Sequence, residues 1–466
     1  MNNDERRLDT ETTGRASEFE DRDLLRLIEE SGTGFRVVST LLLLTLLTGW
    51  ALFGRQVLYG LGVTGMNQPV GWGFYIVNFV FFIGISHAGT LISAILRLSK
   101  AEWRRPITRM AEVITVVVLG IGCVHPVLDL GRPDRMLNIF TAGRLQSPLL
   151  WDVTSISAYF MASTVYLYIP MIPDIALLRD RGVWPHWFYS FLSWGWRGRP
   201  SQRRVLDRAV SIMMVLVIPI AVSVHTVISY IFAMTLQPGW HSTIFGPYFV
   251  VGAIFSGIAA LLMVMIVLRR IFHLERYLKL VHFANLSKLL LVMSLLWFYF
   301  TFSEYLTAFF GHEPTEMRVF HYKFSGPYAI FFWGMFAGNF LIPVGLLSFR
   351  RTRTIPGIMI ASITVVIGMW LERLNIVVPS LANPRLAYPT GFYIPSVVEW
   401  GMFVGAIATF ILGFVVFARF FPLISIWEIR EGREVSVAET AERLREYLPS
   451  PAPAREAAAS GSGYHE

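Results

Sequence analysis

The sequence predicts an all-α integral membrane protein with about ten transmembrane helices. Its 466 residues are 54% hydrophobic and only 15% charged, whereas a soluble domain carries roughly 25% charged residues. The apolar residues gather into long runs, and about 20 such residues cross a hydrocarbon core of about 30 Å as a helix. A water-soluble fold would leave these runs exposed, so the membrane-spanning helix is the unit to count.

Ten apolar runs are long enough to span a bilayer. They lie at residues 37–61, 71–98, 107–128, 149–172, 208–236, 245–272, 283–310, 326–349, 355–377 and 396–420. The segment 1–36 is polar and lacks the short apolar core and cleavage site of a signal peptide, so we expect the first run to be retained as a helix. The polar segment 421–466 ends in a Pro-, Ala- and Ser-rich stretch, which predicts partial disorder.

Lysine and arginine alternate between successive loops. The loops after the second, fourth, sixth and eighth helices carry nineteen of them, and the loops after the odd-numbered helices carry seven. Cytoplasmic loops are enriched in these residues. The alternation therefore supports the helix count and predicts that both termini are cytoplasmic. It also explains the net charge of +8 as a matter of topology rather than of nucleic-acid binding.

A weak internal repeat relates the second and sixth helices. The spacing from glycine to tyrosine to arginine is the same in both, at Gly73, Tyr75 and Arg97 and at Gly246, Tyr248 and Arg270. This predicts two four-helix bundles, helices 2–5 and 6–9, related by an axis along the membrane normal and flanked by helices 1 and 10. The alternative is coincidence among similar apolar helices.

Several polar side chains fall inside the predicted helices. An ionisable group there costs about 2.5 to 3.5 kcal/mol on insertion scales and normally faces the bundle interior, so each one needs a reason. In chain order these residues are Asn78, His87, Glu112, His125, Asp152, His225, Glu304, Glu372, Arg373 and Glu399.

His87 lies near the middle of the second helix, among small residues that let neighbouring helices approach closely. Histidine titrates near neutral pH, which suits it to accept a proton; a structural bond to a neighbouring hydroxyl is the alternative. The predicted topology places His125 and Asp152 near the outer ends of their helices. We therefore expect these two residues to lie at a similar depth in the membrane.

The third helix ends in a motif rich in helix breakers. Pro126 and Pro133 are expected to break the helix, and Asp129 and Arg132 are close enough in sequence to pair locally. A structural turn held by that ion pair is one interpretation of the motif.

Two other sites in the helices have a structural and a functional interpretation. Glu112 is either a proton entry point or a partner for Arg105 or Arg109. Glu372 and Arg373 are adjacent, and adjacent residues point to different sides of a helix, so we expect their partners on other helices and a role in packing.

Metal chemistry is restricted by the single cysteine, Cys123. The chain can form no internal disulfide and cannot by itself ligate an iron–sulfur cluster or a cysteine-based zinc site. A b-type haem needs two facing histidines, and His125 and His225 are the candidate pair at comparable depth. No helix carries a repeated histidine pair, so haem binding remains the alternative to a metal-free chain.

Six short motifs resemble the NrfD/PsrC family of polysulfide-reductase membrane subunits, and most closely the quinol-oxidising membrane subunits of bacterial alternative complex III. The resemblance extends from the first helix to beyond the last. The motifs are residues 69–78, 87–90, 129–133, 147–152, 370–373 and 426–428.

The resemblance implies a quinone-reactive subunit of the bacterial inner membrane that binds menaquinone or ubiquinone and holds no metal. Its implied partners are an external iron–sulfur subunit, a multihaem cytochrome and a second NrfD-like membrane subunit, which carry the iron–sulfur clusters and haems. The family's quinone pocket lies in the first four-helix unit near the outer surface. Here that corresponds to the region of Trp72, Asn78, His87, His125 and Asp152.

This yields a hypothesis for the reaction. The chain would oxidise quinol near the outer face and pass electrons to the iron–sulfur partner. His87 or Asp152 would accept protons, because quinol hydroxyls cannot lose electrons in a low-dielectric site while keeping their protons. Asn78 and Trp72 would orient the ring by hydrogen bonding and stacking.

Other functions stay open. A second hypothesis adds a proton route from the cytoplasmic side through Glu112 and His87, with His225, Glu304, Glu372 and Arg373 as further candidates. A quinone-reducing or anchoring subunit of a polysulfide-reductase-like or related molybdo-oxidoreductase complex is an alternative. A secondary transporter is another, since ten helices and a repeat also suit alternating access.

Overall fold

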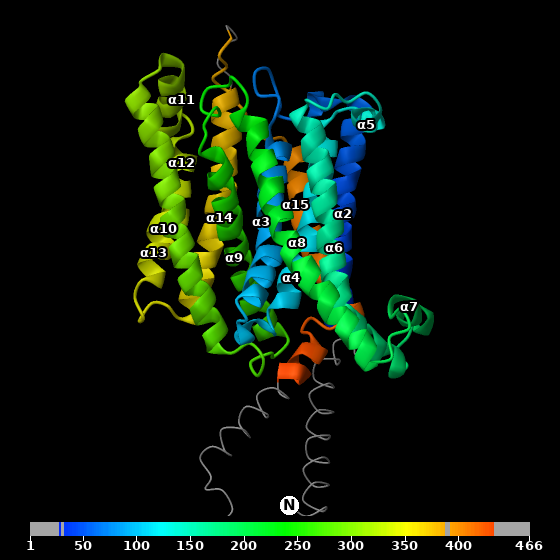
Figure 1. The fold of residues 1–466 in the computed structure, drawn as a ribbon. Helices are drawn as coiled ribbons and strands as arrows, with labels where there is room; N and C mark the ends of the chain where they lie inside the picture. The colour runs from blue at the N-terminus through cyan, green and yellow to red at the C-terminus, as the bar shows by residue number, and fades with distance from the viewer. Residues whose placement is uncertain (1–27, 29–31, 387–391, 433–466) are drawn as a thin grey trace, which may run out of the picture.

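The computed structural model describes residues 28, 32–386 and 392–432, and over these residues the chain is helical and without β-strands. Ten of its helices are long and apolar enough to cross a membrane. Figure 1 shows them standing side by side with their axes roughly aligned. The prediction of an all-α fold with ten transmembrane helices is confirmed.

The ten spanning helices match the ten predicted runs in order. They are α2 (Thr33–Tyr59), α3 (Phe74–Leu98), α4 (Thr108–Asp129), α6 (Pro148–Asp180), α8 (Pro200–Ala233), α9 (Phe245–Ile271), α10 (Leu280–Gly311), α12 with a π-helical turn and α13 (Ala329–Phe336, Ala337–Leu341, Ile342–Leu347), α14 (Ile355–Leu381) and α15 (Val397–Phe420).

Short helices occupy the connections. These are α5 (Asn138–Thr141), α7 (His186–Leu192), α11 (Pro314–Phe324) and three 3₁₀ turns at Leu61–Val63, Glu102–Arg104 and Pro133–Arg135. Among the spanning helices that exceed their apolar runs, α6 and α8 do so most: α6 continues to Asp180 and α8 already begins at Pro200. The apolar run marks only the part inside the hydrocarbon, whereas polar residues can extend the same helix beyond it.

The end of α4 differs from the expectation. Pro126 lies inside the helix, which continues to Asp129. Proline removes one backbone hydrogen bond, but in a membrane bundle the surrounding groups tolerate that loss. The expected pair of Asp129 and Arg132 is also wrong, because Arg132 binds Asp134 at 2.8 Å on the exposed turn.

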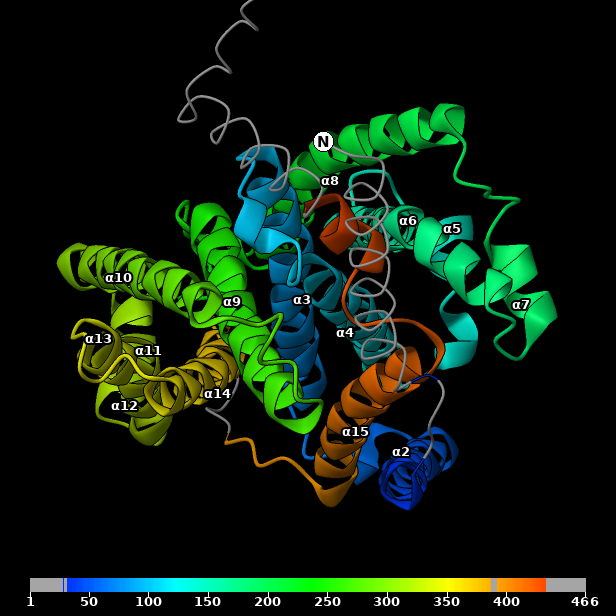
Figure 2. The ribbon, with the colours of Figure 1, turned by 90° about the horizontal axis from the view of Figure 1, so that it is seen from below.

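Helix contacts show how the bundle is assembled. The helices α3, α4, α6 and α8 contact one another in a ring, and α9, α10, α12–α13 and α14 form a second group joined to the first through α3 and α9. The helices α2 and α15 pack together, and α15 also contacts α4. Figure 2 shows α3 near the centre of the assembly, with α2 and α15 on one side of it.

The burial pattern fits this arrangement. Nearly every described side chain of α3 is buried, whereas α2 buries only Gly49 and Gln56. The leucines of α2 are therefore largely exposed on the outside of the bundle. At Gly49 an added Cβ would lie 3.3 Å from the carbonyl oxygen of Gly401 and 3.5 Å from Cα of Gly405. Glycine at these positions lets α2 approach α15 closely.

One end of the bundle carries α7 and residues 421–432, and the other carries α5 and α11 (Figure 1). We call the first the arginine-rich end, because the loops after α3, α6, α9 and α13 meet there, and the second the opposite end. The placement of both termini in the cytoplasm stays a prediction. Most of the N-terminal segment and residues 433–466 lie outside the described residues.

Candidate functional site

His125 on α4 is buried and presents one ring nitrogen without a partner. Its Nδ1 lies 2.9 Å from the carbonyl oxygen of Ile121 one turn earlier. A nitrogen that contacts a carbonyl must carry the hydrogen, which fixes the neutral tautomer and leaves Nε2 as an acceptor. This Nε2 has no hydrogen-bond partner among the described residues. It is therefore a buried base available to a ligand.

An apolar cavity of about 140 Å³ adjoins His125 between α2, α4 and α15. An apolar cavity of about 150 Å³ can hold benzene, so the space accepts a six-membered ring. Trp50, which lines it, is 46% exposed. The cavity is lined by Leu46, Gly49, Trp50, Ile121, Val124, His125, Leu128, Met402, Gly405, Ala406 and Thr409.

A polar chain that the sequence analysis missed lies beside this cavity. The Tyr75 hydroxyl donates to Gln56 Oε1 at 2.5 Å, and Gln56 Nε2 donates to the carbonyl oxygen of Leu128, a lining residue, at 2.7 Å. Gln56 is 2% exposed on a helix that otherwise faces lipid. An amide in a lipid-facing helix is the one signal that pointed to it.

Asn78 is linked to His125 by a row of aromatic side chains. The Trp370 indole N–H donates to Asn78 Oδ1 at 2.9 Å. From Trp370 the ring centroids step 5.8 Å to Phe403, 6.3 Å to Phe82 and 5.2 Å to His125. Of the five predicted quinone-site residues, the structure therefore associates Asn78 and His125 on the α14–α15 side of α3.

His87 lies on another side of α3 and is fully buried. Its Nδ1 lies 2.8 Å from the Ile83 carbonyl oxygen, and its Nε2 lies 2.8 Å from the Ala221 carbonyl oxygen of α8. A neutral imidazole can donate to only one of these acceptors, whereas an imidazolium donates to both. The geometry suits a ring that holds a proton and leaves no nitrogen free for a quinol.

His225 on α8 packs against His87, with ring centroids 4.0 Å apart. Neither of its ring nitrogens has a hydrogen-bond partner among the described residues. His125 instead contacts Phe82, and Phe82 and His87 project from α3 about 140° apart. The alternative haem pair of His125 and His225 therefore does not face a shared space.

Trp72 and Asp152 lie apart from the His125 cavity. Trp72 stacks on Trp240 at 5.9 Å and meets Phe232 edge-on, which connects it to α8 and the following loop. Asp152, in the second turn of α6, is 6% exposed, and its Oδ1 has no hydrogen-bond partner within the described part of the chain. Neither residue lines the cavity.

The second helix group contains a buried ion pair. Arg373 Nη1 lies 3.0 Å from Glu372 Oε2, and the Trp297 indole donates to Glu372 Oε1 at 2.7 Å. The guanidinium carbon of Arg373 also lies 4.7 Å from the centroid of Phe249. Both side chains thus have partners on other helices, as expected, and the two charges also lie close together, because long side chains on adjacent residues can bend toward each other.

A cavity of about 30 Å³ lies beside Glu372, with room for roughly one water. Glu304 lines it and accepts a hydrogen bond from Ser242 at 2.5 Å. Lys323 of α11 also lines it and is 4% exposed. Burial lowers the pKa of Lys323 to about 8, although the carboxylates of Glu304 and Glu316 oppose this. Lys323 was not predicted as a site residue because its position in the sequence was assigned to a loop.

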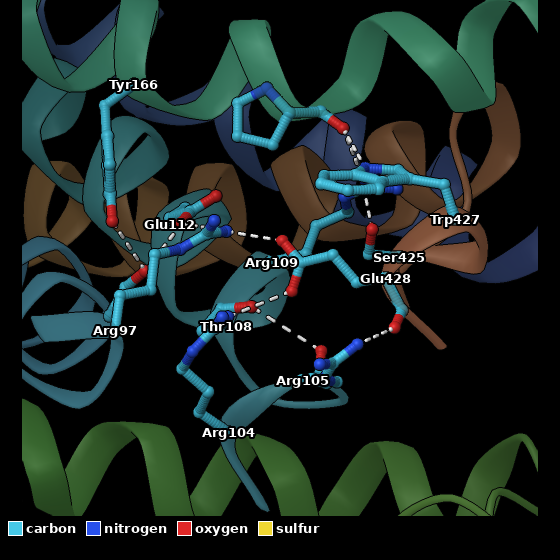
Figure 3. A network of polar contacts seen from close by, with 12 residues as sticks. Arg97, Arg104, Arg105, Thr108, Arg109, Glu112, Tyr166, Ser425, Trp427 and Glu428 are labelled. Atoms are coloured by element: carbon cyan, nitrogen blue, oxygen red, sulfur yellow. Dashed lines mark hydrogen bonds and ion pairs between the residues drawn. The ribbon is translucent and has the colours of Figure 1, made fainter. Parts of the chain in front are cut away.

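Glu112 lies at the arginine-rich end of α4 and is 2% exposed. It accepts a hydrogen bond from Ser93 at 2.6 Å, and its nearest cation is Arg97 at 3.8 Å, in the region drawn in Figure 3. The expected partners Arg105 and Arg109 bind other acidic residues. Glu112 is thus connected to α3.

Residues 422–428, which we call the C-terminal strap, fold across this end of the bundle (Figure 3). The Glu428 carboxylate pairs with Arg97 at 2.5 Å and with Arg104 at 3.1 Å. Arg105 also donates a hydrogen bond to the backbone carbonyl oxygen of Glu428. Burial opposes ionisation of Glu428, but Arg97 and Arg104 outweigh it and hold the pKa of this carboxyl below its usual range. The strap thereby joins the end of α3 to the turn that precedes α4.

A second buried pair anchors the strap to α6. Arg109 pairs with Asp174, and both side chains are 2% exposed. Asp174 also accepts the backbone N–H groups of Ile426 and Trp427, each at 3.1 Å. Asp174 was not predicted as a site residue because it lies just beyond the predicted end of its helix. An aspartate between Ile172 and Ile175 is the signal that was available.

These features define a class: a polytopic helical membrane protein whose interior holds buried proton-accepting side chains and an apolar cavity. The chain belongs to the NrfD family, since the family described as polysulphide reductase, NrfD, matches residues 62–384. The resemblance found in the sequence motifs is confirmed.

Three relatives cover most of the chain. A putative dimethyl sulfoxide reductase membrane protein of Halobacterium salinarum is 27% identical, over 89% of this chain and 95% of the relative. A subunit of the selenate reductase of Mesobacillus selenatarsenatis is 24% identical, over 81% and 93%. The Hdr-like menaquinol oxidoreductase integral membrane subunit of Archaeoglobus fulgidus is 22% identical, over 84% and 95%.

Proposed function

We propose that this chain is the quinone-reactive membrane subunit of a respiratory oxidoreductase complex. It binds quinol in the apolar cavity beside His125, oxidises it, and passes the electrons to an iron–sulfur partner. The observation that carries the proposal is the buried, unpartnered Nε2 of His125 at a cavity large enough for a six-membered ring. The family and the names of the relatives, which include a menaquinol oxidoreductase subunit, support it.

His125 acts as the first base. A quinol hydroxyl donates its hydrogen bond to Nε2, and the proton moves to His125 as the ring loses electrons, because separated charge is costly in a low-dielectric site. Full oxidation of one quinol to quinone releases two protons and two electrons. The electrons leave to the iron–sulfur partner. Asp152, which lies outside the cavity and has an unpartnered Oδ1, is the proposed acceptor of the second proton after that proton has left the ring.

The other predicted site residues have supporting roles in this proposal. Asn78 and Trp370 fix the aromatic row behind His125. Trp72 packs with Trp240 at the opposite end of the bundle, where the external partner would dock. His87 holds a proton between two carbonyl groups and does not touch the ring.

The same proposal assigns the assembly. The iron–sulfur clusters and haems belong to partners, namely an external iron–sulfur subunit and a multihaem cytochrome, with a second NrfD-like membrane subunit beside this chain as in alternative complex III. The complex lies in a bacterial inner membrane with the arginine-rich end in the cytoplasm. The loop charges support that orientation.

The purified complex in lipid vesicles tests the function. We expect it to oxidise menaquinol or ubiquinol with an external electron acceptor and to bind a quinone analogue. A complex that binds no analogue would favour a mere anchor. Solute accumulation without quinol turnover would favour a transporter.

His87→Ala tests whether His87 contacts the quinol ring. Because His87 contacts carbonyl groups rather than the cavity and is not one of the two proposed proton acceptors, we expect kcat and KM for quinol oxidation to change only a few-fold. Steady-state kinetics of the assembled complex measure both values. His282→Ala, a buried histidine on α10, is the control; a raised KM in His87→Ala would place His87 at the ring instead.

A second function, proton conduction, is favoured by a row of buried hydroxyl groups. Ser93 bonds Glu112 at 2.6 Å and approaches the Tyr166 hydroxyl at 3.2 Å. One turn further along α3, Thr90 approaches Ser163 at 3.5 Å, and His87 follows. Hydroxyl groups can both donate and accept hydrogen bonds, which a proton relay requires. We propose this row as a proton route from Glu112 to His87.

The second helix group continues the proposed route toward the opposite end. His225 lies against His87, and Arg373, Glu372 and Glu304 follow toward the cavity that has room for roughly one water. With Glu112 near the arginine-rich end and Glu304 near the opposite end, ionisable groups extend across the bundle.

Glu112→Gln tests this route. We expect fewer protons to be translocated per electron in vesicles while quinol turnover persists. The glutamine amide oxygen can still accept the hydrogen bond from Ser93, but the amide cannot take up and release a proton. Glu102→Gln, at an exposed ion pair on the same end, should leave the stoichiometry intact. A normal ratio in Glu112→Gln would eliminate the path.

A further inference from the structure

The connection between α6 and α8 forms an arm at the arginine-rich end. It consists of residues 181–199 and contains α7 (His186–Leu192). Figures 1 and 2 show α7 beyond the outline of the spanning helices, to one side of the bundle. Nothing in the proposed quinone chemistry requires such a projection.

Contacts with α15 fix the depth of the arm. The Tyr189 hydroxyl donates to the carbonyl oxygen of Phe420 at 3.1 Å, and the Phe188 ring lies 5.9 Å from Phe420 and 6.0 Å from Phe421. Phe420 is the last residue of α15, a spanning helix of 24 residues and so about 36 Å in length. The arm therefore lies where the hydrocarbon ends and the lipid headgroups begin.

The arm is held in place rather than loosely attached. Arg179 donates to Ser193 Oγ and to the carbonyl oxygen of Trp196, both at 2.8 Å. The Tyr168 hydroxyl donates to the carbonyl oxygen of Leu192 at 2.5 Å. The outward direction of its side chains is consequently a property of the fold.

Four large aromatic side chains of the arm point outward. Trp184 is 81% exposed, Trp187 and Phe191 are 72% exposed, and Trp194 is 80% exposed. Trp187 and Phe191 are four residues apart and share one face of α7, while Tyr189 is buried against the bundle. Tryptophan is enriched at membrane interfaces because its ring is amphipathic.

The charge of the same region is strongly positive. Residues 179–208 contain seven arginines and two aspartates. Six of the arginines are exposed: Arg181, Arg197, Arg199, Arg203, Arg204 and Arg208. Clustered basic residues beside a membrane attract anionic lipid headgroups, each contributing on the order of 1 kcal/mol.

We infer that this arm is a lipid-docking element that inserts its aromatic side chains into the headgroup layer and binds anionic phospholipids through the adjacent arginines. The occupant is the bilayer in which the protein already lies. The depth set by Phe420, the outward aromatic face and the positive charge all match that surface. The inference is independent of the quinone proposal.

Neutralising an arginine pair tests the lipid contact. In the full-length protein, R203Q/R204Q should reduce the affinity for phosphatidylglycerol by about 30-fold, as two basic residues near an anionic surface predict. Native mass spectrometry of lipid titrations measures this. R350Q/R351Q, an exposed arginine pair in another loop at the same end, is the control. Equal loss in both variants, or no loss in R203Q/R204Q, would overturn the proposal.

A spin label identifies what covers the aromatic face. In a C123A background, F191C in the assembled complex in bilayers should be accessible to oxygen and shielded from a water-soluble nickel reagent, as for L296C on the lipid-exposed side of α10. L145C, in an exposed loop at the opposite end, should show the reverse. A label at F191C that is protected from both reagents would show that another protein packs over the arm and would overturn the proposal.

Discussion

His125→Gln is expected to abolish quinol oxidation while leaving quinol binding nearly intact. The glutamine amide oxygen can still accept a hydrogen bond in the cavity, but it cannot take the proton. Loss of a general base typically lowers the rate by about 10² to 10⁴-fold. We therefore expect kcat to fall within that range and the affinity for a quinone analogue to change only a few-fold, as measured by turnover and by analogue binding to the same preparation.

Filling the cavity should abolish binding itself, whereas His125→Gln should abolish only the reaction. Ala406 lines the cavity and is 8% exposed, so Ala406→Phe would occupy the space proposed for the ring and abolish analogue binding. Ala259, buried on α9 outside this cavity, can be changed to Gly as a control for folding. Unchanged turnover in both His125→Gln and Ala406→Phe would move the quinol site elsewhere, for example toward Asp152.

Asp174→Ala is expected to produce a large loss of stability. It leaves the Arg109 guanidinium buried without its counter-charge, and breaking a buried pair in this way costs about 3 to 5 kcal/mol. The N–H groups of Ile426 and Trp427 also lose their acceptor. We expect a lower thermal midpoint in detergent and faster trypsin cleavage after Arg430, because the C-terminal strap is released.

Asp180→Ala is the matched control. Asp180 lies at the end of the same helix, is 66% exposed and pairs with Arg179. Exposed ion pairs contribute about 0 to 1 kcal/mol, so this variant should retain the midpoint and the protease resistance of the parent protein. Equal stability of Asp174→Ala and Asp180→Ala would show that the buried pair does not hold the strap.

The residues of the candidate site could be predicted from the sequence only in part. His125 and its position near the end of α4 followed from the sequence, because polarity within an apolar run is a local property. Its free Nε2 and the cavity did not, since both depend on how α2 and α15 pack against α4. His87 was likewise identified from sequence, but the carbonyl oxygen of Ala221 that occupies its Nε2 is contributed by a distant helix.

The charged residues illustrate the same limit. Glu112 was expected to pair with an arginine on its own helix or the loop before it, yet its nearest cation is Arg97 on α3. Asp174 was overlooked because it lies past the apolar run that defined its helix. Its partner Arg109 and the strap come from parts of the chain far from it in sequence.

The sequence alone determined the ten helices, their order and the end at which the arginines gather, because length and hydropathy act within each segment and the membrane imposes one thickness on all of them. Only the tertiary structure decided which polar groups meet, where a cavity remains and which aromatic side chains stay uncovered. Those features depend on contacts between helices far apart in the chain, and no local pattern encodes which side chain will lie across an interface.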